Sequence, residues 1–128
     1  LGFLNKFGIQ ISIACYERYI HQGTVFFSYC SLKEFALIQE IIQEEEYTYQ
    51  TYFQFLTSNQ IQLLKAIAKE EIVNEINSAT FIKKYDLKGA SSINVALKSL
   101  INKEFVLKEQ QGYIVYDRFL AIWLKGLV

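Results

Sequence analysis

The chain has 128 residues, of which 52% are hydrophobic and 16% aromatic, and its formal net charge at pH 7 is zero. This length allows one or at most two small domains, and the apolar content excludes an intrinsically disordered chain. The neutral balance excludes an overall electrostatic attraction to nucleic acid or to an anionic membrane. The charge is uneven, however, because residues 1–56 carry 3 basic and 6 acidic side chains, whereas residues 57–128 carry 10 and 7.

Residues 1–56 are predicted to form a helical segment. Over residues 4–20 the apolar side chains recur at helical spacing, at Ile9, Ile13, Tyr16 and Ile20. A second helix is predicted to begin at Ser31, which can form a capping box with Glu34. Its apolar face consists of Phe35, Ile38, Ile41 and Ile42. The acidic run at residues 44–46 is expected on a solvated face, as is usual for charge runs.

A cluster of aromatic residues follows this segment: Tyr47, Tyr49, Tyr52, Phe53 and Phe55. One interpretation is that the rings form a core between the two regions of the chain. The other is a stacking platform for nucleic-acid bases, which normally lies in a basic groove. The core interpretation is favoured, because no basic residue occurs between Lys33 and Lys65.

The next helix has the clearest start signal in the chain. Thr57 can cap it, and Gln60 stands three residues later, which gives a capping box. Leu56 and Ile61 are placed to form a hydrophobic staple around the same cap. The apolar face is predicted to consist of Ile61, Leu64, Ile67 and Ala68.

Two further helices with a tight turn between them are predicted. Ser78 caps a short helix whose buried side is Phe81, Ile82 and Tyr85. The turn at residues 86–89 ends in Gly89, which can adopt a positive φ without a Cβ clash. The helix at residues 91–103 has a core stripe of Ile93, Ala96, Leu97, Leu100 and Ile101. The opposite side carries Ser91, Asn94, Lys98 and Asn102.

A β-hairpin and a last helix complete the chain. Strands are predicted at residues 105–107 and 113–116, with a turn at residues 110–112. Asp117 can cap the last helix, which is apolar almost all round and is therefore expected to be buried on more than one side. We expect this helix to pack partly on the winged helix and partly on the N-terminal helices or an upstream domain, with Trp123 shielded. The alternative is that it only completes the core of the winged helix.

The predicted fold class is mainly α with a small β-hairpin. The order of elements indicates a winged helix-turn-helix domain at residues 57–128 with a C-terminal helix, preceded by the helical segment 1–56. In this fold the second helix of the motif can enter the major groove of DNA, and the hairpin forms the wing. The candidate DNA contacts are therefore Ser91, Asn94, Lys98 and Asn102 on the helix and Lys108, Gln110 and Gln111 in the wing. Neither set contains arginine, so any binding to duplex DNA is expected to be weak.

No catalytic, cofactor or metal site is predicted in this chain. The loops GxxxxGK[ST], GxGxxG and GxSxG are absent. His21 has no nucleophile placed beside it, so it is not expected to act in catalysis. Cys15 and Cys30 do not form a CxxC pair, so reduced thiols and a cytoplasmic location are expected. The apolar stretch at residues 9–30 contains charged residues, so no membrane-spanning helix is predicted.

The chain resembles the C-terminal end of archaeal-type P-loop ATPases of the AAA+ class. The resemblance covers roughly residues 31–127 and rests on the runs LTSNQIQLLKAIAKE and SATFIKKYDLKGASSINVALKSLINKEFVLKEQQGYIVYDRFLAIWL. It implies a helical lid followed by a winged helix, with ATP and Mg²⁺ bound by an upstream nucleotide-binding domain. The chain starts with Leu1 and contains no methionine, so we expect it to be a fragment of such a protein.

Two functions are therefore predicted from the sequence. One is a regulatory or interaction module of a P-loop ATPase, which packs on the helical lid and contacts DNA weakly or not at all. The alternative is a DNA-binding winged-helix transcription regulator. The residues exposed on the helix at 91–103 are the feature that distinguishes the two.

Overall fold

The structure, a computed structural model, describes residues 2–4, 10–12 and 32–126. The chain divides into two compact units, Leu1–Glu44 and Glu45–Val128. The helix α2 (Leu32–Tyr52) begins in the first unit and ends in the second. Among the described residues, no helix combines the length and the apolar character that crossing a membrane requires.

In the first unit, β1 (Gly2–Leu4) and β2 (Gln10–Ser12) pair antiparallel, with Phe3 opposite Ile11. The helix predicted at residues 4–20 is therefore wrong at Leu4 and at residues 10–12, and the rest of that range lies outside the described residues. The physical reason lies in an ambiguous pattern. Isoleucines at 9, 11 and 13 alternate with polar residues, which is the strand period, although 9 and 13 also fit a helix.

The acidic run in α2 is not uniformly solvated. Glu44 and Glu46 are exposed, but Glu45 is only 7% exposed, which corrects the prediction of a solvated face. Glu45 stands four residues after Ile41 and four before Tyr49, both of which are buried. Helical periodicity therefore places its side chain on the buried face of α2, although its neighbours in sequence point to solvent.

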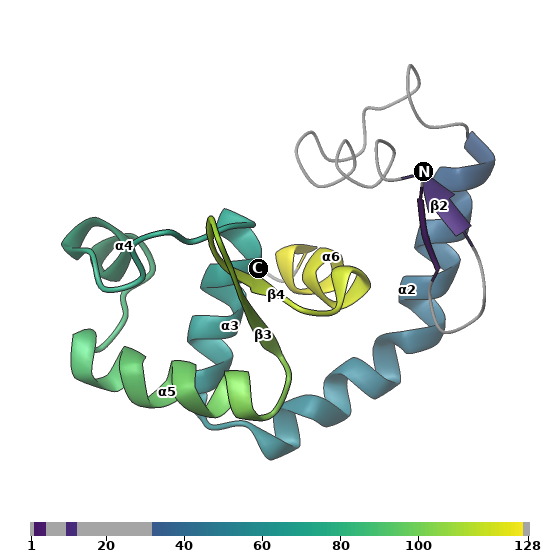
Figure 1. Ribbon diagram of the computed structural model, residues 1–128. Coiled ribbons are helices and arrows are strands. Elements are labelled where there is room, and N and C mark those ends of the chain that lie inside the picture. Colours follow the sequence, from purple (N-terminus) through teal and green to yellow (C-terminus); the bar gives the residue numbers. More distant parts are fainter. Residues whose placement is uncertain (1, 5–9, 13–31, 127–128) are drawn as a thin grey trace. The chain divides into compact units, whose positions relative to one another are not determined.

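The second unit has the predicted order of elements. After the short 3₁₀ helix η1 (Phe53–Phe55) come α3 (Ser58–Glu70), α4 (Ala79–Lys84) and α5 (Ala90–Asn102). The strands β3 (Val106–Glu109) and β4 (Gly112–Val115) form an antiparallel hairpin, and α6 (Arg118–Gly126) follows (Figure 1). The predicted fold class, mainly α with a small β-hairpin in a winged helix-turn-helix, is confirmed.

The caps predicted from the sequence are present. The Thr57 hydroxyl accepts from the Gln60 amide N–H at 3.3 Å, and the Gln60 side chain accepts from the Thr57 N–H at 3.0 Å. The Gln60 side chain also donates to the Ser99 hydroxyl at 3.0 Å, so the cap of α3 is joined to α5. Ser78 accepts from the Phe81 N–H at 3.2 Å at the start of α4.

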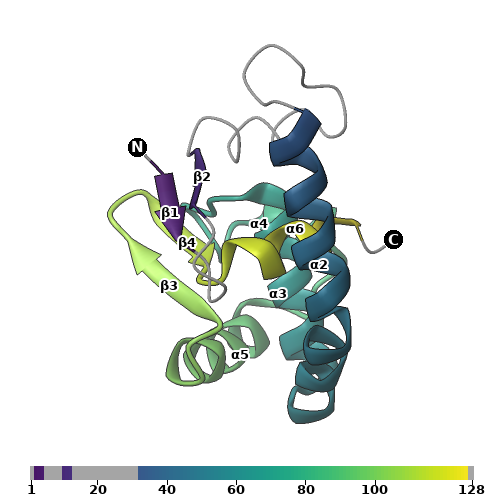
Figure 2. The same ribbon diagram turned by 90° about the vertical axis from the view of Figure 1, so that its right-hand side faces the viewer.

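The core of the second unit lies around α3, because α5 and α6 both pack against it (Figure 1, Figure 2). This double packing explains why α3 buries Leu63 and Ala66 in addition to the predicted Leu64, Ile67 and Ala68, while Ile61 is only half-buried. In α5 the predicted core residues Ile93, Ala96, Leu97 and Leu100 are buried. Ile101 was also expected in this stripe, but it is 37% exposed, because it stands at the edge of the buried arc.

A contact between distant residues attaches the hairpin to the segment after α3. Val73 and Tyr113 form an isolated antiparallel bridge. The Val73 N–H donates to the Tyr113 carbonyl and the Tyr113 N–H to the Val73 carbonyl, with N to O distances of 3.0 Å and 2.9 Å. Val73 therefore extends the hairpin by a third, minimal strand. Gly112 lies against this segment with φ +142°, and the backbone of Val73 passes where a Cβ atom would stand.

The terminal helix α6 begins at the predicted cap, since Asp117 accepts from the N–H groups of Phe119 and Leu120 at 2.9 Å and 3.1 Å. Trp123 is shielded, as predicted, and its ring centroid lies 5.5 Å from those of Tyr49 and of Phe53. The helix thus packs on α3, on β4 and on the end of α2. Burial raises the pKa of the Tyr49 hydroxyl, and the nearby carboxylates of Asp117 and Glu45 raise it further.

The aromatic cluster at residues 47–55 is divided between core and surface. Tyr49 is buried, and Tyr52 meets the Phe105 ring edge-on at a centroid distance of 5.3 Å. These contacts agree with the predicted role as a core. Tyr47 and Phe55 are largely exposed and do not belong to it.

Candidate nucleic-acid interface

The turn between α4 and α5 sets the direction in which α5 leaves the motif. The Leu87 N–H donates to the Ile82 carbonyl at 2.9 Å, which closes the end of α4. Gly89 then adopts φ +130°, as predicted for a residue without a Cβ, and its carbonyl accepts the first helical N–H of α5, from Ile93. Both ends of the turn are therefore fixed by backbone geometry.

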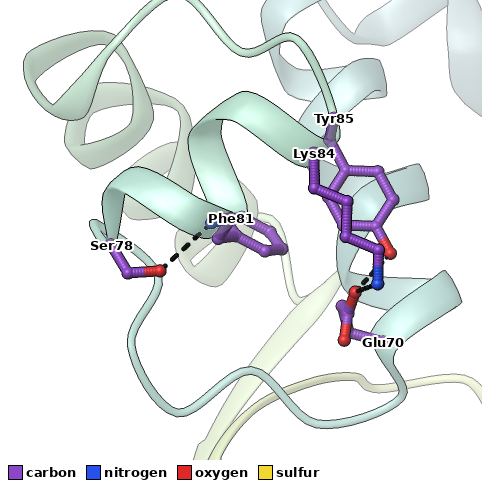
Figure 3. A network of polar contacts seen from close by, with 5 residues as sticks. All are labelled: Glu70, Ser78, Phe81, Lys84 and Tyr85. Carbon is purple, nitrogen blue, oxygen red and sulfur yellow. Dashed lines mark hydrogen bonds and ion pairs between the residues drawn. The ribbon is translucent and has the colours of Figure 1, made fainter.

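A polar network attaches α4 to the end of α3 (Figure 3). The Glu70 carboxylate forms an ion pair with Lys84 and accepts from the Tyr85 hydroxyl at 2.5 Å. The hydrogen bond from Lys84 has the largest effect in lowering the pKa of Glu70, and the hydrogen bond from Tyr85 lowers it further. Beside the network, the rings of Phe81 and Tyr85 lie 5.2 Å apart between centroids. The network positions α4, and with it the start of α5.

Replacing Glu70 by glutamine is expected to remove a pH-dependent part of the stability. The folded-state pKa of Glu70 is lowered, so its contribution is present above the pKa of the unfolded chain and is lost as pH falls through the folded-state value. The urea midpoint of the wild type should exceed that of Glu70→Gln at pH 7, and the gap should close toward acid pH. The matched control is Glu75→Gln, at an exposed glutamate in the next loop, which should shift the midpoint little. A gap that stays constant between pH 7 and acid pH would show that the ionised Glu70 does not stabilise the fold.

One face of α5 is open to solvent. The predicted Ser91, Asn94, Lys98 and Asn102 are all exposed and share this face by helical spacing. The same spacing adds Ile101 and Val95, which is 73% exposed. We call these six residues the outward face of α5. Val95 was not predicted on this face, although its position four residues after Ser91 and three before Lys98 is sufficient to find it.

Some polar groups near this face already have partners within the protein. The Asn94 side-chain carbonyl accepts from the Asn77 amide at 3.0 Å, which anchors the loop before α4 to α5. Lys103, just after α5, donates to the Phe55 carbonyl at 2.8 Å, so its ammonium group already makes a hydrogen bond within the protein. Lys98 stands exposed near the middle of the outward face.

The predicted contacts in the wing are also exposed. Gln110 and Gln111 form the two-residue turn between Glu109 and Gly112, which are opposite each other in the hairpin register. The Lys108 ammonium lies 5.9 Å from the centroid of the Tyr113 ring. Arg118, which was not among the predicted contacts, lines an open groove together with Gln110 and Gln111. The wing turn therefore has a second basic residue close to it.

A second open groove, of about 440 Å³, runs between the first turn of α3 and the first half of α5. Its lining includes Thr57 and Asn59 from the α3 side and Ser91 and Val95 from α5. The groove borders the outward face, so a molecule that covers α5 would also meet the start of α3.

Within the described part of the chain, no group of three or more His, Cys, Asp or Glu residues is placed to hold a metal ion. His21, Cys15 and Cys30 lie outside the described residues. The arrangement on α5 and the wing offers hydrogen-bonding amides, hydroxyls and ammonium groups, which suit binding rather than acid–base or metal chemistry.

Comparison with known proteins gives one family. A family model described as "Probable winged helix domain" matches residues 47–126, well over half of the chain. No curated protein and no solved structure shows a significant match. The matched range starts in the last turns of α2 and ends with α6, so it includes the outward face of α5 and the whole hairpin.

Proposed function

The chain belongs to the winged helix domain family, and on this premise we propose that it binds duplex DNA with the outward face of α5 in the major groove. In this role the β3–β4 hairpin, which is the wing, lies along the phosphate backbone. The DNA-binding winged-helix regulator is thus the function that the geometry supports best.

The observation that carries this proposal is the composition of α5. The helix contains no acidic residue, and its outward face presents exposed hydroxyl, amide and ammonium groups alongside the apolar Val95 and Ile101. A carboxylate on this face would repel the phosphates on either side of the groove. Serine and asparagine side chains hydrogen-bond to base edges and to phosphate oxygens.

The same composition limits affinity and specificity. Guanine is most often read by arginine or lysine in bidentate contact, and the outward face offers Lys98 alone. Lys108 in the wing adds a phosphate contact, but Glu109 stands next to it in sequence. We therefore expect weak binding with little discrimination of guanine.

Binding to a short labelled duplex should be strongly salt-dependent. A contact set of ~2–4 phosphates implies that the logarithm of the association constant falls against the logarithm of salt concentration with a slope of roughly −2 to −4. Lys98→Ala and Lys108→Ala should each weaken binding and make the slope shallower by about 1, if each contacts a phosphate. Fluorescence anisotropy from low to physiological salt measures both quantities.

Lys69→Ala is the matched control, because Lys69 is also exposed but lies in the last turn of α3 rather than on α5 or the wing. It should leave the salt slope unchanged. Absence of binding even at low salt would refute the proposal. Binding that is lost equally in all three variants would show that the effect is one of net charge and not of this face.

A second function is supported by two exposed aromatic side chains. Tyr47 in α2 and Phe55 in η1 are large aromatic residues that stay exposed outside α5 and the wing. Exposed aromatic residues are frequent in protein–protein contacts. We propose that they contact an upstream nucleotide-binding domain, as in the ATPase module, with ATP and Mg²⁺ held by that domain. Either function would be carried out in the cytoplasm.

A Walker A motif in the coding sequence before Leu1 would support the ATPase module, and an upstream sequence without one would rule it out.

A further inference from the structure

Val95 is the more exposed of the two large apolar residues on the outward face of α5. It lies near the middle of α5 along the sequence and is 73% exposed, so its methyl groups face solvent. A β-branched residue loses χ1 freedom in a helix, so valine is a poorer helix former than alanine or leucine. Neither helix propensity nor burial in the core therefore accounts for valine at this position.

Val95 lies within the face that is proposed to bind DNA. Ser91 and Lys98 flank it on the outward face, one turn before and one turn after, and Asn94 precedes it. On its other side Val95 lines the groove toward the start of α3. Its two methyl groups thus have hydrogen-bonding groups as neighbours on the outward face, whereas Ala96 shares the lining of the groove with them.

The chemistry of the major groove contains one apolar group that matches such a side chain. The base edges present hydrogen-bond donors and acceptors, except for the C5 methyl group of thymine. Valine against a donor or acceptor would remove water without replacing the hydrogen bond, which is unfavourable. Valine against a methyl group buries apolar surface on both partners.

We propose that Val95 reads a pyrimidine C5 methyl group in the major groove, so that the DNA preferred by α5 carries thymine opposite Val95. This inference rests on the proposed DNA binding and adds the specificity of that site. It also agrees with the absence of arginine from the outward face, because the protein then prefers A·T pairs through methyl contacts rather than G·C pairs through guanine readout. The group is shared with 5-methylcytosine, so the two sources must be separated by experiment.

The test compares the full chain on alternating A·T and alternating A·U duplexes, which differ only by the C5 methyl group. Wild-type protein should bind the A·U duplex about fourfold more weakly for each contact, the factor that corresponds to ~0.8 kcal/mol for one buried carbon group. In Val95→Ala the ratio between the two duplexes should fall toward one, and in Val95→Ile it should persist. Fluorescence anisotropy at low salt is the readout, and equal melting temperatures of the variants show that folding is unaffected.

Two further arms complete the design. Tyr47→Ala also truncates an exposed apolar side chain, but in α2, and should leave the thymine-to-uracil ratio unchanged. Alternating G·C duplexes with and without 5-methylcytosine identify the source of the methyl group. Tighter binding to the methylated form assigns the preference to the methyl group on either base, and equal binding restricts it to thymine.

The outcomes distinguish this inference from the function on which it rests. If no duplex binds at low salt, the proposed DNA binding fails and the inference falls with it. If A·T and A·U duplexes bind equally well, DNA binding stands and the inference is overturned. If Val95→Ala keeps the wild-type ratio, another residue reads the methyl group, and the assignment to Val95 is overturned.

Discussion

Alanine at Gly112 is expected to lower the free energy of unfolding by about 2–6 kcal/mol. Gly112 has φ +142°, a conformation that costs an L-residue ~1–3 kcal/mol. A Cβ atom built there would stand 2.3 Å from the Val73 carbonyl oxygen and 2.9 Å from the Asn74 nitrogen, and such overpacking costs a further ~1–3 kcal/mol. The neighbouring atoms belong to the backbone, so they cannot retreat without breaking the Val73–Tyr113 bridge. Urea denaturation of the variant and the wild type measures the loss.

Two other glycines separate the contributions. Gly89 has φ +130° but open space where a Cβ atom would stand, so Gly89→Ala should cost only the conformational ~1–3 kcal/mol. Gly126 has neither a positive φ nor a close neighbour, so Gly126→Ala should change stability by less than about 1 kcal/mol. If Gly112→Ala costs no more than Gly89→Ala, the close approach of Val73 to the hairpin has no energetic consequence.

Removing the indole of Trp123 should cost about 3–5 kcal/mol, the usual range for truncation of a large buried aromatic residue. Trp123 is buried and joins α6 to the rings of Tyr49 and Phe53, each at 5.5 Å between centroids. The substitution Trp123→Ala therefore leaves a cavity and removes two ring contacts at once. The measurement is again the unfolding free energy from urea melts.

Tyr116→Ala is the matched control, because Tyr116 is a large aromatic residue whose side chain is exposed. Surface substitutions of this kind usually change stability by less than about 0.5 kcal/mol. A loss below about 1 kcal/mol for Trp123→Ala would show that α6 is an appendage and not part of the core.

The sequence predicted the features whose signals are local. The caps at Thr57, Ser78 and Asp117 were found because each side chain bonds to an amide only two or three residues away. The core of α5 was found because four of its apolar residues recur at helical spacing. A local pattern needs no knowledge of the partner, since almost any partner buries the same face.

Features that depend on a distant partner could not be predicted. The Val73–Tyr113 bridge joins residues 40 positions apart, and nothing in the sequence around Val73 indicates it. For the same reason Gly112 was interpreted as a turn residue, whereas the structure also requires it for a close backbone approach. The burial of Glu45 was missed because the charge run was treated as a unit, although its helical spacing from Ile41 and Tyr49 contains the answer.

The candidate interface was predicted in part. Ser91, Asn94, Lys98 and Asn102 were placed on one face from helical geometry, and the structure exposes all four. Ile101 was missed on this face because it was assigned to the core stripe, and Val95 was assigned neither to the core nor to the exposed side. Arg118 was missed beside the wing because its proximity to Gln110 and Gln111 arises only when α6 packs back on the hairpin.

The most direct test of DNA binding by α5 is amide NMR of the isotope-labelled chain during titration with duplex DNA at low salt. Binding through the outward face predicts chemical-shift changes concentrated at Ser91, Asn94, Val95, Lys98 and Asn102, with a second set in the wing around Lys108. The amides of Tyr47 and Phe55, whose exposed side chains lie outside α5 and the wing, should keep their free positions. A spectrum that does not change, or changes confined to Tyr47 and Phe55, would contradict the assignment of α5 as the DNA-binding element.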